Sequence, residues 1–232
     1  MAKVLIGCQA RTNSVRLPGK SHLHIGNKSL VATVLDRSVK AAGWAVEKKL
    51  GRVSIILLVP QGDPLKDEFS HKYEVFEGPE DDVLTRYHNC ATLHNFDYVM
   101  RLTGDCVWLP ASVIFKCLKQ ALIRETDYCS NVLFRSFVEG YDCEILSRRA
   151  LEYAHKQAVT PEDREHVTTF LIRDILNGNP TGLKVHTVFN EYDLSDVKTS
   201  IDTQEEFMNS LAKFDILKDK KRDATRVGSI SF

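Results

Sequence analysis

Three cations follow the first apolar segment of the chain within one polar loop. Arg11, Arg16 and Lys20 come after residues 4–8, which are apolar throughout, and Ser14 stands among them. Arginine grips phosphate oxygens with a planar fork of N–H groups, whereas lysine supplies a mobile point charge. Open α/β sheets bind their ligands beyond the carboxyl ends of the strands. The loop therefore predicts a polyphosphate site, with a solvated cationic loop as the alternative.

One common phosphate-binding loop is excluded by the spacing. Gly19, Lys20 and Ser21 match the end of a Walker A loop. That motif needs another glycine five residues before its final glycine, and this chain has Ser14 there. Another kind of strand-loop-helix unit must therefore position the cations.

Strands and helices that would position this loop alternate through the first half of the chain. Buried strands are expected over residues 4–8, 53–59, 73–76 and 97–103, where apolar residues dominate. Apolar residues at helical spacing predict helices over 30–39, 82–94 and 112–124, the first of them capped by Ser29. This alternation predicts an α/β fold, with a mostly parallel sheet and helices on both faces.

The second half is less regular. We expect a strand over 142–146, a helix over 147–157, and a further helix from Thr160 to near Gly178. An edge strand is expected over 183–189, and a strand ending near Asp202 leads into a last helix with a capping box at Thr203. The predicted organisation is one domain over residues 1–217, with a hairpin-and-helix region at about 135–180, and a solvated charged tail over 218–232.

Composition limits the class of partner. The chain has 31 basic and 31 acidic residues, so no net field favours nucleic acid or an anionic membrane. Six cysteines are scattered without a C-x-x-C pair, which is typical of buried free thiols in a reducing compartment. No apolar run reaches the roughly 18 residues of a membrane span. We therefore expect a soluble cytoplasmic protein of 232 residues.

Six short blocks along the chain carry a family resemblance. They are, in order, A-R-T-N-S-V-R-L-P-G-K (10–20), E-D-D-V-L-T-R-Y (80–87), R-L-T-G-D-C (101–106), G-Y-D-C-E (140–144), R-E-H-V-T (164–168) and D-T-Q-E-E (202–206). Together they resemble the sugar-acid cytidylyltransferases, which include keto-deoxyoctulosonate cytidylyltransferase. The resemblance is stronger still to the branch of spore-coat polysaccharide biosynthesis proteins, and it extends over residues 9–206.

The resemblance implies a fold and a reaction. The fold would be the Rossmann-like sheet of nucleotide-diphospho-sugar transferases, known as GT-A-like. A hydroxyl of an acidic sugar or related small acid would attack the α-phosphorus of CTP with the help of Mg²⁺, and pyrophosphate would leave. Such enzymes act by positioning the reactants and neutralising phosphate charge. The CMP-sugar would serve polysaccharide biosynthesis, and residues 140–167 would form the contact of a homodimer.

The resemblance also implies roles at the nucleotide and at a metal ion. Arg11 and Lys20 would hold the β- and γ-phosphates, and Asp105 and Asp202 would bind Mg²⁺. The alternatives are ordinary turn chemistry for Asp105 and a strand-end position for Asp202. The implied catalytic residues are Arg11, Lys20 and Asp105. The implied nucleotide-binding residues are Gln9, Ala10, Arg11, Ser14, Arg16, Lys20, Asp82 and Gly104.

The acceptor site is less well marked. Its candidate residues are Arg101, Asp142, Glu144, Arg164 and His166, which could equally form structural ion pairs or dimer contacts. Where the family usually has G-D-C-P-L-I-D, residues 104–110 read G-D-C-V-W-L-P. Trp108 within this stretch is expected either to pack in the core or to form a platform for the acceptor.

Two other functions remain open. A glycosyltransferase that uses a nucleotide sugar would share the sheet and a metal-binding acid, although such enzymes usually show D-x-D where this chain has Gly104-Asp105-Cys106. A catalytically silent nucleotide-binding protein is the other alternative. Both phosphate cations and both candidate metal acids are present, which favours the enzyme.

Overall fold

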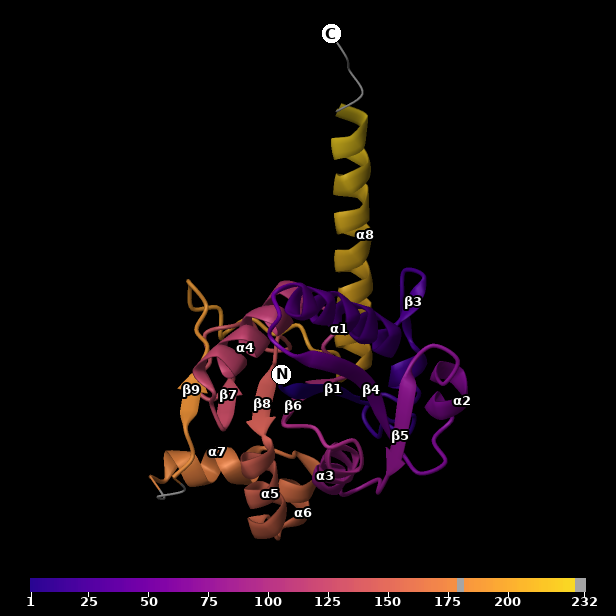
Figure 1. Ribbon diagram of the computed structural model, residues 1–232. Helices are drawn as coiled ribbons and strands as arrows, with labels where there is room; N and C mark the ends of the chain where they lie inside the picture. The colour runs from indigo at the N-terminus through magenta and orange to yellow at the C-terminus, as the bar shows by residue number, and fades with distance from the viewer. Residues whose placement is uncertain (179–181, 228–232) are drawn as a thin grey trace.

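A seven-stranded sheet forms the centre of the molecule (Figure 1). The computed structural model describes residues 1–178 and 182–227, and for residues 218–227 it describes the backbone alone. In chain order the strands are β1 (Lys3–Gln9), β4 (Arg52–Pro60), β5 (Glu74–Gly78), β6 (Tyr98–Thr103), β7 (Tyr128–Ser130), β8 (Glu144–Ser147) and β9 (Val185–Thr187). They pair in the order β5, β4, β1, β6, β8, β7, β9. Each pair is parallel except the two that β8 makes with β6 and β7.

Helices cover both faces of this sheet, so the predicted mostly parallel, Rossmann-like α/β fold is confirmed (Figure 1). One face carries α1 (Leu30–Glu47) and α4 (Ala111–Arg124). The other carries α3 (Val83–Leu93), α5 (Arg148–Gln157), α6 (Pro161–Glu165) and α7 (Thr169–Leu176). Smaller elements are the 3₁₀ turn η1 (Lys20–His22), the hairpin of β2 (His24–Ile25) and β3 (Lys28–Ser29), and α2 (Leu65–Phe69). None of the helices in the described ranges has an apolar stretch of membrane-spanning length.

Strand β1 is buried on both faces and fixes the floor beneath the cationic loop. Val4 and Ile6 pack into the core on the side of α1 and α4, whereas Leu5 packs on the opposite side with α3. At Gly7 an added Cβ would stand 2.5 Å from the ring of Tyr87. Glycine therefore lets the Tyr87 hydroxyl approach and donate to the Gly7 carbonyl at 2.9 Å. The loop after β1 consequently starts from a rigid position.

Most predicted elements of the first half are confirmed, and so are two predicted helix caps, each of which depends on a few neighbouring residues. Ser29 caps α1 by accepting a hydrogen bond from the Ala32 amide, as its sequence position predicted. The capping box also forms, because the Glu206 amide donates to Thr203 Oγ1 and the Thr203 amide donates to Glu206. It opens α8 (Gln204–Val227), which projects from the body of the molecule (Figure 1).

Two predictions for the second half are wrong. The helix expected from Thr160 to near Gly178 is divided into α6 and α7, because Val167 between them has a positive φ of 63° that no helix can contain. The strand expected to end near Asp202 does not form, since 188–203 is irregular apart from an isolated bridge at Lys198. Part of the predicted tail, 218–227, continues α8, and 228–232 lie outside the described residues.

Candidate functional site

A cavity of about 250 Å³ opens beyond the carboxyl ends of β1 and β6. Its walls come from the cationic loop, the segment after β6, the start of α3, the end of α6 and Asp202. Eleven of the sequence candidates line it, namely Gln9, Ala10, Arg11, Ser14, Arg16, Lys20, Arg101, Gly104, Asp105, His166 and Asp202. The loop and the two acids predicted to meet at this edge of the sheet therefore do so.

The cationic loop is held in place by side chains that the sequence reasoning did not single out. Ser21 is buried, and its hydroxyl donates to the Arg11 carbonyl at 2.7 Å. Thr12 donates through its amide and its hydroxyl to the two carboxylate oxygens of Asp63, at 2.8 and 2.7 Å. Gly19 adopts a φ of 68°, which starts the turn η1 that carries Lys20. The two basic side chains Arg11 and Lys20 thus extend from an ordered loop.

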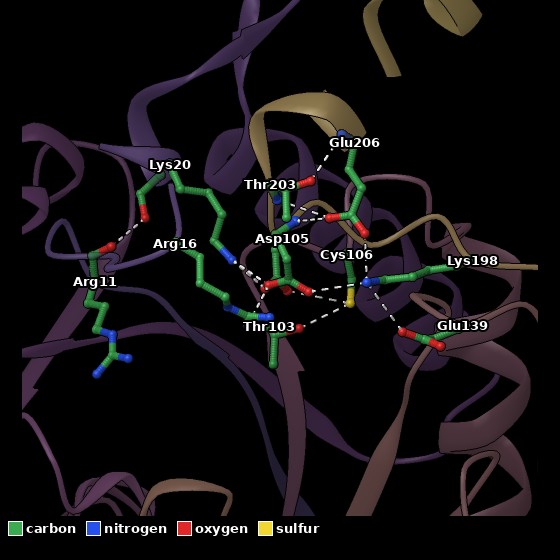
Figure 2. A network of polar contacts seen from close by, with 12 residues as sticks. Arg11, Arg16, Lys20, Thr103, Asp105, Cys106, Glu139, Lys198, Thr203 and Glu206 are labelled. Atoms are coloured by element: carbon green, nitrogen blue, oxygen red, sulfur yellow. Dashed lines mark hydrogen bonds and ion pairs between the residues drawn. The ribbon is translucent and has the colours of Figure 1, made fainter. Parts of the chain in front are cut away.

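Lys20 bridges the two candidate metal acids. Its ammonium nitrogen lies 2.7 Å from Asp105 Oδ2 (Figure 2) and 3.2 Å from Asp202 Oδ1, although 85 and 182 residues separate these acids from Lys20 in sequence. Burial alone would raise the pKa of Asp105, but the adjacent Lys20 ammonium outweighs it and lowers that pKa below its ordinary value. Asp105 is therefore a charged carboxylate at neutral pH.

Asp202 is held by three further residues. The Asp202 amide donates to Glu206 Oε2 at 2.7 Å, so the first turn of α8 fixes its backbone. Lys198, which the sequence analysis missed, lies with its Nζ 2.7 Å from Glu206 and 3.7 Å from Asp202 Oδ2 (Figure 2). Arg16 donates to Asp202 Oδ1 at 2.9 Å from the loop side. Because Lys198 follows no strand and has no motif, nothing in its local sequence marked it.

The two carboxylates of Asp105 and Asp202 suit Mg²⁺ better than they suit a metal ion that is coordinated by protein side chains alone. No group of three or more His, Cys, Asp or Glu side chains with metal-binding geometry occurs in residues 1–178 and 182–217. Asp105 and Asp202 nevertheless converge on one point. Mg²⁺ commonly takes one or two carboxylates and completes its octahedron with phosphate oxygens and water. Two acids at the edge of a cavity lined by Arg11, Arg16 and Lys20 match that preference.

Arg11 reaches the far side of the cavity. Its guanidinium lies 3.1 Å from Glu165 at the end of α6, and both side chains are partly exposed. Arg86, which the sequence analysis did not single out, is buried in the wall nearby. Its guanidinium donates to the carbonyls of Pro79 and Glu80 and so fixes the segment that leads into α3.

The candidate Asp82 lies outside this lining. It caps α3 by accepting the Thr85 amide and hydroxyl, at 2.8 and 2.7 Å. Arg164 also points away from the cavity, with its guanidinium 3.6 Å from Asp82 and 3.4 Å from the Thr85 hydroxyl. Neither residue lines the described pockets. In this arrangement both join α3 to α6.

A second, more open pocket of about 320 Å³ adjoins the first. It is lined by Arg101, Val132, Arg135, Asp142, Glu144, His166, Thr168, Thr169 and Ile172. Four of the five acceptor candidates are in this set, so the structure gathers them where a second substrate could sit beside a nucleotide. Arg135 is an addition, and it grips Asp142 with two hydrogen bonds at 2.6 and 3.1 Å.

Arg101 and Glu144 form the wall between the two pockets. The guanidinium donates to Glu144 at 2.6 Å and to Gln9 at 3.0 Å. The Tyr128 hydroxyl donates to the other oxygen of Glu144 at 2.8 Å. Glu144 is buried, and its pairing with Arg101 follows from the antiparallel register of β6 and β8. The pair thus supplies a fixed wall with no free charge.

Trp108 packs away from both pockets. Its indole N–H donates to Ser210 of α8 at 3.3 Å, and the ammonium of Lys213 lies 5.1 Å from the ring centroid. The structure therefore supports the interpretation that Trp108 packs in the protein and does not form an acceptor platform.

All six cysteines are free and buried, as their scattered positions predicted.

Known proteins resemble the chain over nearly its whole length. The cytidylyltransferase family profile matches residues 5–227. The spore coat polysaccharide biosynthesis protein SpsF of Bacillus subtilis is 24% identical over 174 residues, which are 74% of this chain and 70% of that protein.

Two solved structures share the fold. A cytidylyltransferase from Leptospira borgpetersenii aligns with a TM-score of 0.79 at 24% identity and covers 100% of this chain and 99% of its own. A CMP:2-keto-3-deoxy-manno-octonic acid synthetase complexed with CTP aligns with a TM-score of 0.63 at 15% identity, over 91% and 98% of the two chains. At these identities the structural similarity shows the fold alone. Family membership is shown by the family profile, which matches the sequence over residues 5–227. The resemblance carried by the six blocks is thereby confirmed, and the chain belongs to the cytidylyltransferase family of CTP-using nucleotidyltransferases.

Proposed function

We propose that this protein transfers CMP from CTP to a hydroxyl of a small acidic sugar or related acid, with Mg²⁺ bound between the nucleotide and Asp105 and Asp202. The observation that carries the proposal is the convergence of Lys20, Asp105 and Asp202 at the mouth of a cationic cavity. The CTP and sugar acid in the name of the octonic acid synthetase support the choice of substrates. The polysaccharide biosynthesis in the name of SpsF supports a role of the CMP-sugar product in making a polysaccharide.

The ion pairs of the cavity explain how a triphosphate would be taken up. Each candidate cation is already paired with a carboxylate: Arg11 with Glu165, Arg16 with Asp202, and Lys20 with both acids. A triphosphate with about four negative charges offers these cations stronger partners. Once Lys20 and Arg16 turn to the phosphates, Asp105 and Asp202 become available to a metal ion. When bound, Mg²⁺ would neutralise charge on the α-phosphate and the leaving group.

The reaction itself needs positioning more than covalent chemistry. The acceptor oxygen forms a bond to the α-phosphorus, and the bond between that phosphorus and the bridging oxygen breaks, so that pyrophosphate leaves with the electron pair. Arg11 and Lys20 would stabilise the charge that develops on pyrophosphate. The pocket beside Arg101 and His166 would hold the acceptor next to the α-phosphate.

Pyrophosphate release tests this function directly. The protein is incubated with Mg²⁺, each of the four nucleoside triphosphates, and a panel of acidic sugars that includes octulosonic and nonulosonic acids. We expect release with CTP and at least one of these acids, and a CMP adduct of that acid by mass spectrometry. Lys20→Ala should lower the rate by about 10²- to 10³-fold, as expected for loss of a preorganised charge contact. Lys119→Ala, an exposed lysine on α4, is the matched control. Release of a nucleoside diphosphate from a nucleotide sugar would instead indicate a glycosyltransferase.

A further inference from the structure

His166 lies at the junction of the cavity beside Lys20 and the pocket beside Arg135. Of the residues that line these two pockets, His166 and Arg101 are the two that line both. Arg101 is committed to Glu144 and Gln9 and is permanently charged, so it cannot accept a proton. A neutral imidazole can accept one. The junction is also where the attacking oxygen of an acceptor must lie.

The side chain of His166 has no hydrogen-bonding partner among the described residues. Its backbone is fixed, since its amide donates to the Glu162 carbonyl at 2.9 Å and its carbonyl accepts from the Thr168 amide at 2.6 Å. The ring itself makes no hydrogen bond, ion pair or ring contact with residues 1–178 or 182–217, and the residue is exposed. The other bases of the acceptor pocket are engaged, because Asp142 is held by Arg135 and Glu144 by Arg101.

The backbone next to His166 is strained in a way that holds the ring at this place. Val167 adopts a φ of 63°, and a β-branched residue in this region is a genuine outlier. The hydrogen bond from the Thr168 amide to the His166 carbonyl closes a ring around Val167, which gives the rare γ-turn form with positive φ. The Val167 side chain is fully buried in the core beside α3 and α5. Strained conformations of this kind persist where the surroundings determine them, and they cluster at functional sites.

We propose that His166 is the general base of the reaction and takes the proton from the acceptor hydroxyl as that oxygen attacks the α-phosphorus of CTP. The oxygen–phosphorus bond forms while the O–H bond breaks, the proton passes to a ring nitrogen of His166, and pyrophosphate carries away the electron pair. Val167 is a positioning residue, because its turn places the ring between the two pockets. The inference depends on the proposed function and adds to it the group that activates the acceptor.

Replacement of the imidazole should affect turnover more than nucleotide binding. His166→Asn should lower kcat by about 10²- to 10⁴-fold, the usual contribution of a general base, while the dissociation constant for CTP with Mg²⁺ stays unchanged. His71→Asn, in the exposed turn after α2, is the matched control and should behave as the wild type does. Val167→Gly can still adopt the positive φ but loses the buried side chain that anchors the turn, so it should lower kcat while CTP still binds.

Chemical rescue separates a base from a structural histidine. The ring site is open to solvent, so free imidazole should restore part of the activity of His166→Ala in proportion to its concentration.

The assay follows α-labelled CTP with two acceptors, the best acid from the panel and water itself, so that a rate is obtained even without a preferred sugar. Binding of CTP is measured separately by calorimetry. Wild-type protein that neither binds CTP nor forms CMP or a CMP adduct would refute the proposed function. Wild-type turnover that persists in His166→Asn, or His166→Ala that imidazole does not rescue, would overturn the role of His166 alone.

Discussion

Replacing Lys20 with methionine should reveal the metal site through stability, without any assay of turnover. Methionine keeps much of the length and volume of lysine but removes the charge that Asp105 and Asp202 share. Their nearest oxygens are no farther apart than the sum of 2.7 and 3.2 Å, which is 5.9 Å. Without the ammonium, two carboxylates would therefore face each other at close range.

The size of the effect follows from this separation. At an effective dielectric constant of about 20, two unit charges 5.9 Å apart repel by about 3 kcal/mol. Arg16 and Lys198 still lie near Asp202 and offset part of this repulsion. We therefore expect Lys20→Met to lower the free energy of unfolding by about 1–2 kcal/mol. At about 2–4 °C for each kcal/mol in a chain of this size, the Tm should fall by about 2–8 °C.

Mg²⁺ should reverse this loss. An ion that binds only the native state stabilises it by mass action, and the variant offers two acids without the Lys20 ammonium between them. Thermal melts with and without several millimolar MgCl₂ should show a larger gain for Lys20→Met than for the wild type, in which Lys20 competes for the same acids. Lys119→Met serves as the control for an exposed lysine. A Tm for Lys20→Met equal to that of the wild type, or an equal Mg²⁺ gain in both, would refute the reasoning.

The contribution of Asp105 to stability should change with pH in opposite directions in the wild type and in Lys20→Met. In the wild type the folded pKa of Asp105 is lowered, so its contribution to stability is present above the ordinary carboxyl pKa of about 3.9 and is lost as pH falls through the folded value. In Lys20→Met, burial and the nearby Asp202 would raise the pKa of Asp105. Its contribution would then be present at acid pH and lost as pH rises. Melts between pH 3 and 8, analysed as the difference between the proteins, should show the penalty of the variant growing with pH.

Three further outcomes are expected. CTP with Mg²⁺ should raise the Tm more than ATP, GTP or UTP does, and equal shifts in a thermal-shift assay would argue against base selection. Arg101→Met should leave the buried Glu144 carboxylate without its cation and cost about 3–5 kcal/mol in urea unfolding, whereas loss of an exposed ion pair in Lys66→Met should cost far less. The protein should be a homodimer through residues 140–167, and light scattering that gives one chain's mass across micromolar concentrations would contradict this.

The fold could be predicted where its signals were local. The helix caps at Ser29 and Thr203 were predicted correctly, because a cap depends only on the capping residue and the residue three positions after it. The division between α6 and α7 could not be foreseen, because Val167 is among the residues least suited to a positive φ and is held there by packing. The strand β7 was also missed, since its three residues are too few to show a period.

The site was predictable in its parts but not in its pairings. The cations and both acids were found from their types and motifs, and the structure brings them together. The engagement of Arg101 by Glu144 depends on which residues of β6 and β8 face each other, and that register is set by distant contacts. Arg135 and Lys198 stand in irregular segments without a pattern, so only the folded chain reveals them.

The hydrogen bond between Lys20 and Asp202 joins residues 182 positions apart in the sequence. Contacts of such long sequence separation form only after the intervening chain has been ordered, since closing a long loop costs entropy before the contact can repay it. The acids and cations of the cavity therefore come together late in folding, after the sheet and the first turn of α8 are in place. Partly folded chains should lack the nucleotide site altogether, so the binding of CTP should report on the integrity of nearly the whole chain.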